Sequence, residues 1–300
     1  MTWEYGLIRL FLSICEHYRE ELILECQRLS LNDKPEFTDE EILTIFIYGV
    51  IRGMNTKKKI YRYAKDHLRQ WFPSLPSYVA FVVRLNRIAE VFPSLIERLQ
   101  TQYQLRHPGL GPGHVVDSFP VIMAVSPRCD EAKVAREVAG KGYCSTKDLY
   151  YHGLKIHILA AMRPDTMPFP VRIQVTSGSE NDLTVFERDL SDCLPPGNLY
   201  ADKIYGKGAL VHSLPQEAGV NLLTPVKRKS KSLPLLFFDR LKSEIVSEHR
   251  QPIESLNNWL IEKTDIQNAS KVRSRCGLFV QVFGRLAAAL FMLVEGFSNS

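Results

Sequence analysis

Three acidic residues stand where their carboxylates could do chemistry. Asp117 lies inside an apolar run of strand type, residues 115–119, where a buried carboxylate is unfavourable unless it is paired or binds a metal. Asp202 ends a second apolar run, and Glu254 follows Pro252, a residue favoured in the first turn of a helix. Two aspartates on strands and a glutamate on a later helix can hold two divalent cations through oxygen ligands. Because a metal pair promotes displacement at a phosphodiester, the pattern indicates metal-dependent chemistry on a nucleic acid.

Simpler interpretations of these and neighbouring residues stay open. Each acid alone could be a capped turn or a surface charge. Glu180 and Asp182 follow a Ser-Gly-Ser turn, where they could simply cap a helix. The residues from which a zinc site could be drawn are Cys129, Cys144, His152 and His157. Their spacing matches no common zinc pattern, and the chain has neither a G-x-x-x-x-G-K-[ST] loop nor a G-x-S-x-G elbow.

Composition places the chain among ordinary globular proteins. Its 300 residues, 45% hydrophobic and 24% charged, suit one large or two ordinary domains and exclude a disordered chain, a collagen or a coiled-coil rod. The six cysteines form no C-x-x-C pair, which favours reduced thiols in a cytosol. The N-terminus has no secretory pattern. We therefore expect a cytoplasmic protein.

The most apolar stretch is 277–297, and it is interrupted by Gln281 and Arg285. A spanning helix needs about 20 mostly apolar residues. We expect a buried core helix here and no membrane partner, with membrane insertion as the alternative.

Charge is unevenly distributed along the chain. Residues 1–50 hold 4 basic and 10 acidic residues, whereas 51–110 hold 11 basic and 3 acidic. A second basic block, 227–300, has 12 basic and 7 acidic residues. Such asymmetry indicates a polyanionic partner, although a solvated helix face would give the same pattern.

The first basic block is expected to form short helices. Thr38 and Glu41 make a capping box, Asn55 or Thr56 caps a second helix, and Ser77 caps a third. Three short basic helices suit a helix-turn-helix-like DNA-binding unit, with a plain helical bundle as the alternative. The candidate DNA-binding residues on them are Lys57, Lys58, Lys59, Arg62, Arg84 and Arg87. Because Arg84 and Arg87 lie off the apolar stripe of their helix, we expect them to be exposed.

A change of pattern follows the Gly- and Pro-rich segment 109–113. We place a domain boundary there, between a helical domain, 1–110, and a second domain, 111–300. Strands are expected at 114–123, 154–161, 170–176, 198–201 and 221–226, with helices at 182–190, at 208–218 and from 235 onward, broken around Pro252. This order predicts an α/β fold with one mixed sheet.

The sequence resembles a known family over nearly its whole length. In the N-terminal part the resemblance rests on Asp39-Glu40-Glu41-Ile42-Leu43-Thr44-Ile45, Lys65-Asp66-His67-Leu68, Trp71-Phe72-Pro73, Leu75-Pro76-Ser77-Tyr78 and Arg84-Leu85-Asn86-Arg87. In the C-terminal part it rests on Asp117-Ser118-Phe119-Pro120, Lys141-Gly142-Tyr143-Cys144, Tyr151-His152-Gly153-Leu154-Lys155-Ile156-His157, Gly178-Ser179-Glu180-Asn181-Asp182, Ala201-Asp202-Lys203 and Ile253-Glu254-Ser255. The family is that of the DDE transposases of bacterial insertion sequences, specifically the insertion-sequence group numbered nine hundred eighty-two.

The resemblance implies a ribonuclease-H-like catalytic core after the helical domain. It matches the family's catalytic, metal-binding carboxylates to Asp117, Asp202 and Glu254. The implied cofactor is Mg²⁺, two ions per site, with Mn²⁺ as a substitute. The implied reaction is hydrolysis at the element ends, followed by attack of the freed 3′-hydroxyls on target DNA.

The resemblance also implies the partners. These are double-stranded DNA, as terminal inverted repeats and as target, and further copies of the chain in a homodimer or larger assembly. No nucleotide cofactor is implied. The expected location is the bacterial cytoplasm, with association to the nucleoid when the protein is bound to DNA.

One departure from the family concerns the helix around Glu254. Related transposases often carry Tyr, Arg, the catalytic Glu and Lys in series, whereas Ser247 and Ile261 stand here in place of the Tyr and the Lys. Arg250 fits the series and is a candidate phosphate contact. Further candidates for gripping the DNA backbone are Lys227, Arg228, Lys229 and Lys231, unless they form only an exposed loop.

Two other functions share these residues. The chain could be a catalytically inactive protein that binds element ends, or a metal-dependent nuclease without strand transfer. Terminal inverted repeats flanked by short direct repeats around the gene would favour transposition.

Overall fold

The protein was studied as a computed structural model, which describes residues 3–23, 35–109, 111, 113–207, 213–214, 218–227 and 236–297. The chain divides into two compact units. The helical unit comprises residues 1–103 and 260–300, and the sheet unit comprises residues 104–259.

This division does not coincide with the expected domains, 1–110 and 111–300. Residues 260–300 belong to the helical unit because α10 (Arg275–Glu295) packs against α3 (Asp39–Ile51) and α5 (Tyr78–Arg87). The C-terminal helix was assigned by its position in the chain, whereas its apolar surface is buried among N-terminal helices.

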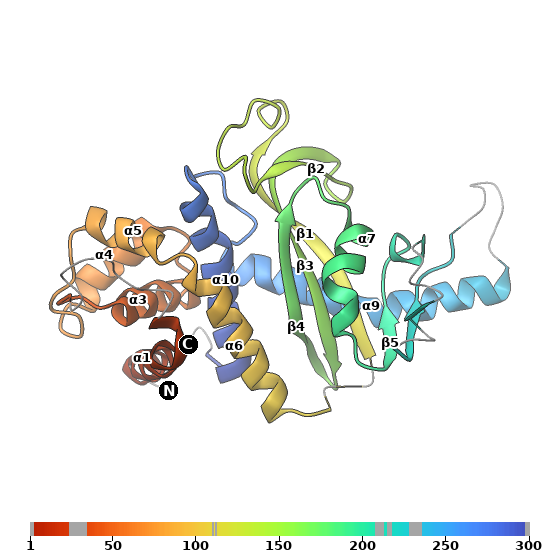
Figure 1. Cartoon of the computed structure of the whole chain (residues 1–300), viewed down its shortest axis with the longest axis horizontal. Coiled ribbons are helices and arrows are strands. Elements are labelled where there is room, and N and C mark those ends of the chain that lie inside the picture. The colour runs from red at the N-terminus through yellow and green to blue at the C-terminus, as the bar shows by residue number, and fades with distance from the viewer. Residues whose placement is uncertain are drawn as a thin grey trace. The chain divides into compact units, whose positions relative to one another are not determined.

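The helical unit is built around α3, which is buried along nearly its whole length. It packs against α1 (Trp3–His17), α4 (Lys57–His67), α5 and α10, as the left side of Figure 1 shows. A π-helical segment, Tyr18–Leu22, continues α1, and α6 (Val91–Arg106) follows α5. A helix that is apolar on all sides is stable in water only when other elements surround it.

The helix starts read from the sequence are confirmed. Thr38 and Glu41 form the expected capping box, with the Glu41 amide donating to Thr38 Oγ1 at 3.3 Å and the Thr38 amide donating to Glu41 Oε2 at 2.6 Å. Thr56, rather than Asn55, caps α4, and Ser77 caps α5. These caps satisfy amides that the first helical turn leaves without intrahelical partners.

Helix α10 is long and apolar enough to cross a membrane by length and composition alone. Of its most apolar window, 72% is buried against the rest of the protein, as in the core helix of a soluble domain. Arg285, which interrupts this apolar stretch, is also buried. Its burial is tolerated because its guanidinium donates to the carbonyl oxygens of Thr264 and Asn55.

The sheet unit contains a mixed six-stranded sheet. Its strands are β1 (Gly113–Val125), β2 (Gly140–Cys144), β3 (Leu149–Arg163), β4 (Thr166–Ser177), β5 (Gly197–Tyr200) and β6 (Val220–Leu223). The first residues of β3 pair with β2 and the later ones with β4, both antiparallel, and β1 pairs along the other edge of β3. On the far side of β1, β5 and then β6 run parallel to it. The mixed α/β fold is therefore confirmed; β2 was not expected from the sequence.

Helical segments cover one face of this sheet. The first is α7 (Asp182–Val185), continued by a π-helical segment, Phe186–Leu190, and a 3₁₀ turn, Ser191–Cys193. Phe186 and Leu190 pack into a cluster with Val116 of β1 and Leu199 of β5. A second 3₁₀ turn, Tyr205–Lys207, follows β5. The expected helix 208–218 lies largely outside the described residues.

The helix α9 (Phe237–Thr264) differs from expectation, because it runs unbroken through Pro252. A proline inside a helix removes one backbone hydrogen bond. Here two residues that follow the proline, Ile253 and Leu256, are completely buried, and their packing outweighs the preference of proline for a break in the helix. Glu254 therefore lies deep within a long helix and not near its start.

We predict opposite effects of the same substitution at two helical glycines. A Cβ on Gly49 of α3 would lie 2.6 Å from Cγ1 of Ile60 on α4, whereas a Cβ on Gly6 of α1 would meet nothing within 4 Å. Gly49→Ala should lower the free energy of unfolding by about 1–3 kcal/mol through overpacking. Gly6→Ala should raise it by about 0.5–1 kcal/mol through helix propensity. Urea denaturation measures both, and stabilisation by both variants would contradict the close α3–α4 crossing.

Candidate active site

The pairing of β1 with β5 brings two of the predicted aspartates level with each other. In this parallel register His114 lies opposite Leu199 and Val115 opposite Tyr200. Asp117 and Asp202 each follow two residues after the last pair. Asp117 lies within β1, whereas Asp202 lies just past the end of β5, so the parallel pairing brings the two chain segments that carry them side by side.

Helix α9 contributes the third carboxylate and two further polar side chains. Arg250, Glu254 and Asn257 are four and three residues apart, so they share one helix face. Arg250 Nη1 lies 3.8 Å from Asp202 Oδ1, and Arg250 Nη2 lies 3.8 Å from Glu254 Oε1. Asn257 Nδ2 donates to Asp117 Oδ2 at 3.0 Å. The structure thus brings the three predicted carboxylates together around Arg250 and Asn257.

A fourth acid, Asp182 at the start of α7, lies beside this group. It accepts a hydrogen bond from Ser118 Oγ at 2.9 Å and lies 3.2 Å from Lys155 Nζ. Asp182 does not cap α7, because Asn181 Oδ1 accepts from the Leu183 amide. The Ser118 hydroxyl and the Lys155 ammonium hold Asp182 in place. The negative charge of Asp182 contributes to raising the pKa of Asp117.

His157 also faces Asp182, with Nδ1 3.5 Å from Asp182 Oδ1. Burial lowers the pKa of His157, which outweighs the attraction of the carboxylate. Its Nε2 is 2.9 Å from Thr176 Oγ1, whereas His152 Nε2 lies 3.0 Å from the Val134 carbonyl oxygen. The two histidines therefore have separate partners and do not share a zinc site.

Burial and like charge act on the innermost carboxylate. The pKa of Asp117 is raised to about 6, chiefly by burial and further by the charges of Glu254 and Asp182, while the Ser118 amide and Arg250 oppose the rise. The glutamate and Asp202 are more open, with side chains 58% and 50% exposed. The cluster thus has one desolvated and two accessible carboxylates.

The donor chemistry of this cluster fits hard divalent cations, which prefer carboxylate and amide oxygens. Asn257 Oδ1 is buried and has no hydrogen-bond partner within the described part of the chain. The guanidinium of Arg250 already balances the charges of Asp202 and Glu254. Over the same described residues, no three His, Cys, Asp or Glu side chains lie close enough together to hold a metal ion, so the oxygens fit such a cation in kind without forming a closed ligand set.

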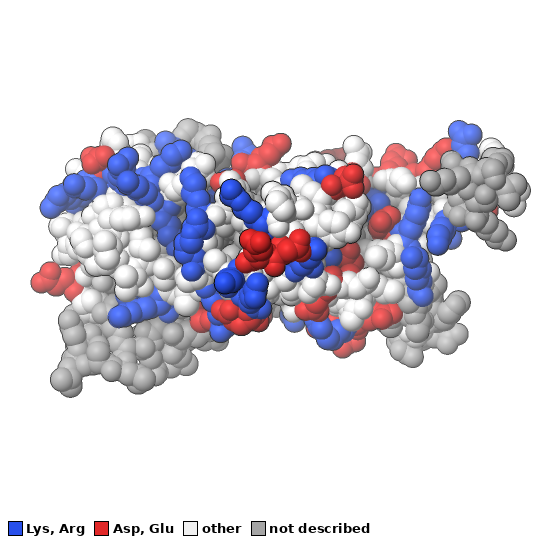
Figure 2. All heavy atoms as spheres, turned by 90° about the horizontal axis from the view of Figure 1, so that it is seen from above, with Lys and Arg blue, Asp and Glu red and all other residues white. Residues whose placement is uncertain are grey.

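The candidate DNA-binding residues fall into three groups. Exposed residues are Lys58, Lys59, Arg62, Arg87 and Lys227, and Figure 2 shows Lys and Arg side chains gathered over α4 and α5. Arg228, Lys229 and Lys231 lie outside the described residues. The remaining residues are held by protein partners: Lys57 donates to Asn86 Oδ1 at 2.7 Å, and Arg250 lies between Asp202 and Glu254.

The expectation that Arg84 is exposed was wrong. Arg84 Nε donates to Asp39 Oδ1 at 2.6 Å, and Arg84 Nη2 donates to Asp39 Oδ2. Its side chain is 18% exposed. The last turn of α5 meets the first turn of α3, where Asp39 also suits the positive end of the helix dipole. Arg84 therefore ties two helices together.

Sequence reasoning missed Asn257 as a site residue and gave Asp182 only a capping role. Asn257 carried no signal, because its place depends on the unbroken course of α9 past Pro252. Asp182 stands in the segment 178–182, which was part of the family resemblance, and this was the signal that could have identified it.

Comparison with known proteins gives one match. A family model described as a transposase DDE domain matches residues 112–275, which is more than half of the chain and includes Asp117, Asp202 and Glu254. No curated protein and no solved structure matches the chain.

We predict that Asp117→Asn stabilises the metal-free protein at high pH. Since the folded pKa of about 6 exceeds the ordinary 3.8, the folded state keeps a proton that the unfolded chain releases. The stability that this proton provides is present below pH 4 and lost as pH rises through 6. At pH 8 the variant should therefore gain up to about 3 kcal/mol over wild type, and the gain should fall to about 1 kcal/mol at pH 4.5.

Urea denaturation in the presence of a chelator, at pH 8 and pH 4.5, measures this difference. Asp165→Asn, in an exposed turn, is the matched control and should show no pH-dependent gain. Equal stability of Asp117→Asn and wild type at pH 8 would mean that Asp117 is not desolvated.

Proposed function

Because the chain belongs to the DDE transposase family, we propose that it is the DNA transposase of a bacterial insertion sequence, with Asp117, Asp202 and Glu254 as its catalytic carboxylates. The observation that carries the proposal is their convergence from β1, the end of β5 and α9 around Arg250. These positions are 85 and 52 residues apart in sequence, and no structural role that we can identify requires them to meet.

The topology of the sheet unit supports a ribonuclease-H-like core. Three long strands, β1, β3 and β4, pair antiparallel, and β5 and β6 then continue the sheet parallel to β1. The first carboxylate is on the first strand, and the second follows the first parallel strand. This is the placement that the resemblance to the insertion-sequence group numbered nine hundred eighty-two implies.

Asp117, Asp202 and Glu254 would hold two Mg²⁺ ions, with Mn²⁺ as a substitute. When bound, such a pair activates the attacking oxygen and stabilises the leaving oxygen of a phosphodiester. Asn257 orients Asp117 through its hydrogen bond, and the two exposed carboxylates face the solvent from which DNA would approach. Arg250 would turn from the carboxylates to a DNA phosphate once cations neutralise them.

The substrates would be the terminal inverted repeats of the element and a target duplex. The 3′-hydroxyls freed by hydrolysis would then attack the target. Since two ends must be joined, the active form would be a homodimer or a larger assembly. The helical unit would supply contacts to the ends, and the sheet unit, residues 104–259, would carry the catalytic carboxylates.

A cleavage assay tests the proposal with the gene's own flanking DNA and Mg²⁺ or Mn²⁺. Wild type should cut at defined ends and join them to a target. Asp202→Asn and Glu254→Gln should lose roughly a thousandfold in rate, equivalent to about 4 kcal/mol, while DNA binding persists. Glu248→Gln, an exposed residue of the same helix, is the matched control and should retain activity.

The alternative functions appear as distinct outcomes of this assay. DNA binding by wild type without metal-dependent cutting would identify an inactive end-binding protein. Cutting without joining would identify a nuclease. Full activity of Asp202→Asn would contradict the assignment of the carboxylates.

A second prediction concerns the exposed basic residues of α4. Replacing Lys58, Lys59 and Arg62 together by Ala should weaken DNA binding and lower the slope of log affinity against log salt by about two to three. Fluorescence anisotropy with a labelled duplex at several salt concentrations measures both quantities. If affinity and slope match those of wild type, this face is only a solvated surface.

A further inference from the structure

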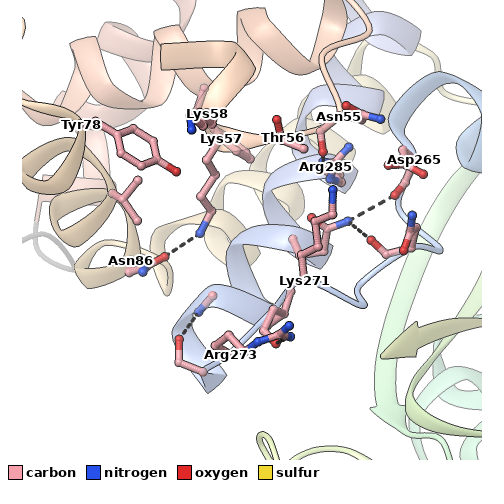
Figure 3. A pocket seen from close by; sticks show the side chains of 17 residues that line it. Asn55, Thr56, Lys57, Lys58, Tyr78, Asn86, Asp265, Lys271, Arg273 and Arg285 are labelled. Atoms are coloured by element: carbon pink, nitrogen blue, oxygen red, sulfur yellow. Dashed lines mark hydrogen bonds between the residues drawn. The ribbon is translucent and has the colours of Figure 1, made fainter. Parts of the chain in front are cut away.

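A cavity of about 510 Å³ lies within the helical unit, and its lining includes none of the three carboxylates. Its walls come from the start of α4, from α5, from the loop before α10 and from α10 itself, as Figure 3 shows. The cavity is large enough for a small ligand, since such sites typically measure about 300–1,000 Å³.

The lining is strongly basic. Five basic residues and one acid line the cavity: Lys57, Lys58, Lys271, Arg273, Arg285 and Asp265. The charge of Asp265 is offset by the attraction of Arg285 and Lys271. The cavity therefore carries a net positive charge and suits an anion.

Two helix N-termini add to this charge. Thr56, Lys57 and Lys58 of the first turn of α4 line one wall, and Ser274 and Gly277 of the first turn of α10 line another. Thr56 and Ser274 cap these helices and accept from the Lys59 and Gly277 amides, while the helix dipole still places partial positive charge at this end. Helix N-termini are established binding positions for phosphate groups.

The side chains of Arg285 and Lys57 could both bind an anion. Arg285 is only 3% exposed, and its Nε has no hydrogen-bond partner within the described residues. An unpaired buried N–H destabilises a protein by about 1–3 kcal/mol. Burial, followed by repulsion from Arg285, lowers the pKa of Lys57 to about 8. An oxyanion between the two cations would satisfy the N–H and offset the repulsion.

We propose that this cavity is a binding site for the phosphate group of a nucleotide, which Arg285 and Lys57 contact between the first turns of α4 and α10. The volume leaves room for the sugar beside the phosphate, and the amides of Asn55, Asn86 and Asn268 line it as further polar contacts. The nucleotide is either part of a DNA strand or a free mononucleotide. The first source rests on the proposed function, whereas the second does not.

The test compares Lys57→Gln with Lys65→Gln in the full-length protein. Both lysines are on α4 and lose one charge, but Lys65 is exposed and does not line the cavity. The probes are thymidine 5′-monophosphate, thymidine without phosphate, and a labelled 12-nucleotide single strand, all in chelator so that no cleavage occurs. Calorimetry measures binding of the mononucleotide, and anisotropy measures binding of the strand.

Wild type should bind the phosphate-bearing probe and not thymidine. Lys57→Gln should weaken binding by about tenfold or more, while Lys65→Gln should change it by no more than about twofold. An effect on the strand alone identifies DNA as the source, and an effect on the monophosphate identifies a free nucleotide. Equal losses in the two variants, or no loss in either, would overturn the proposal.

A second variant keeps the proposal testable if Lys57→Gln does not fold. Arg273 lines the cavity from the loop and is exposed, so Arg273→Gln removes a lining charge without disturbing the core and should weaken binding about threefold to tenfold. Unchanged binding in that variant would also contradict the site. Because the binding assay is independent of cleavage, a protein that binds but never cuts DNA would contradict the proposed transposase activity alone.

Discussion

Carboxylates brought together from three chain segments repel one another, and the site depends on how α9 offsets this repulsion. One face of that helix places the Arg250 guanidinium 3.8 Å from both Asp202 and Glu254, and the Asn257 amide against Asp117. Because Asp202 and Glu254 are more than half open to solvent or close to it, water screens each pair, and each contributes at most about 1 kcal/mol. The parallel pairing of β1 with β5 positions the two aspartates. The site also needs this face of α9, because it supplies their partners Arg250 and Asn257.

Much of the fold could be predicted because its signals are local. The capping box of Thr38 and Glu41, the caps at Thr56 and Ser77, and the apolar strands around Asp117 and before Asp202 each depend on a few adjacent residues. A carboxylate in an apolar strand is itself a local anomaly, which marks Asp117 from a few adjacent residues alone. The family match to residues 112–275 supports the same reading.

What could not be predicted depends on residues far apart in sequence. Pro252 locally favours a break, yet buried Ile253 and Leu256 keep α9 continuous. This continuity places Asn257 beside Asp117, 140 residues away in sequence. Arg84 looked exposed because its own helix places it off the apolar stripe, whereas Asp39, 45 residues earlier, pairs with it. Pattern reasoning within one element cannot find such a partner.

Asp117, Asp202 and Glu254 are proposed to form one metal site on DNA. Anomalous diffraction tests this on crystals of the protein bound to uncleavable element-end DNA and soaked in Mn²⁺. We expect anomalous peaks bounded by these three carboxylates next to a phosphodiester, with Arg250 turned away from them. Mn²⁺ bound elsewhere, with Arg250 still between Asp202 and Glu254 in the DNA complex, would contradict the proposed site.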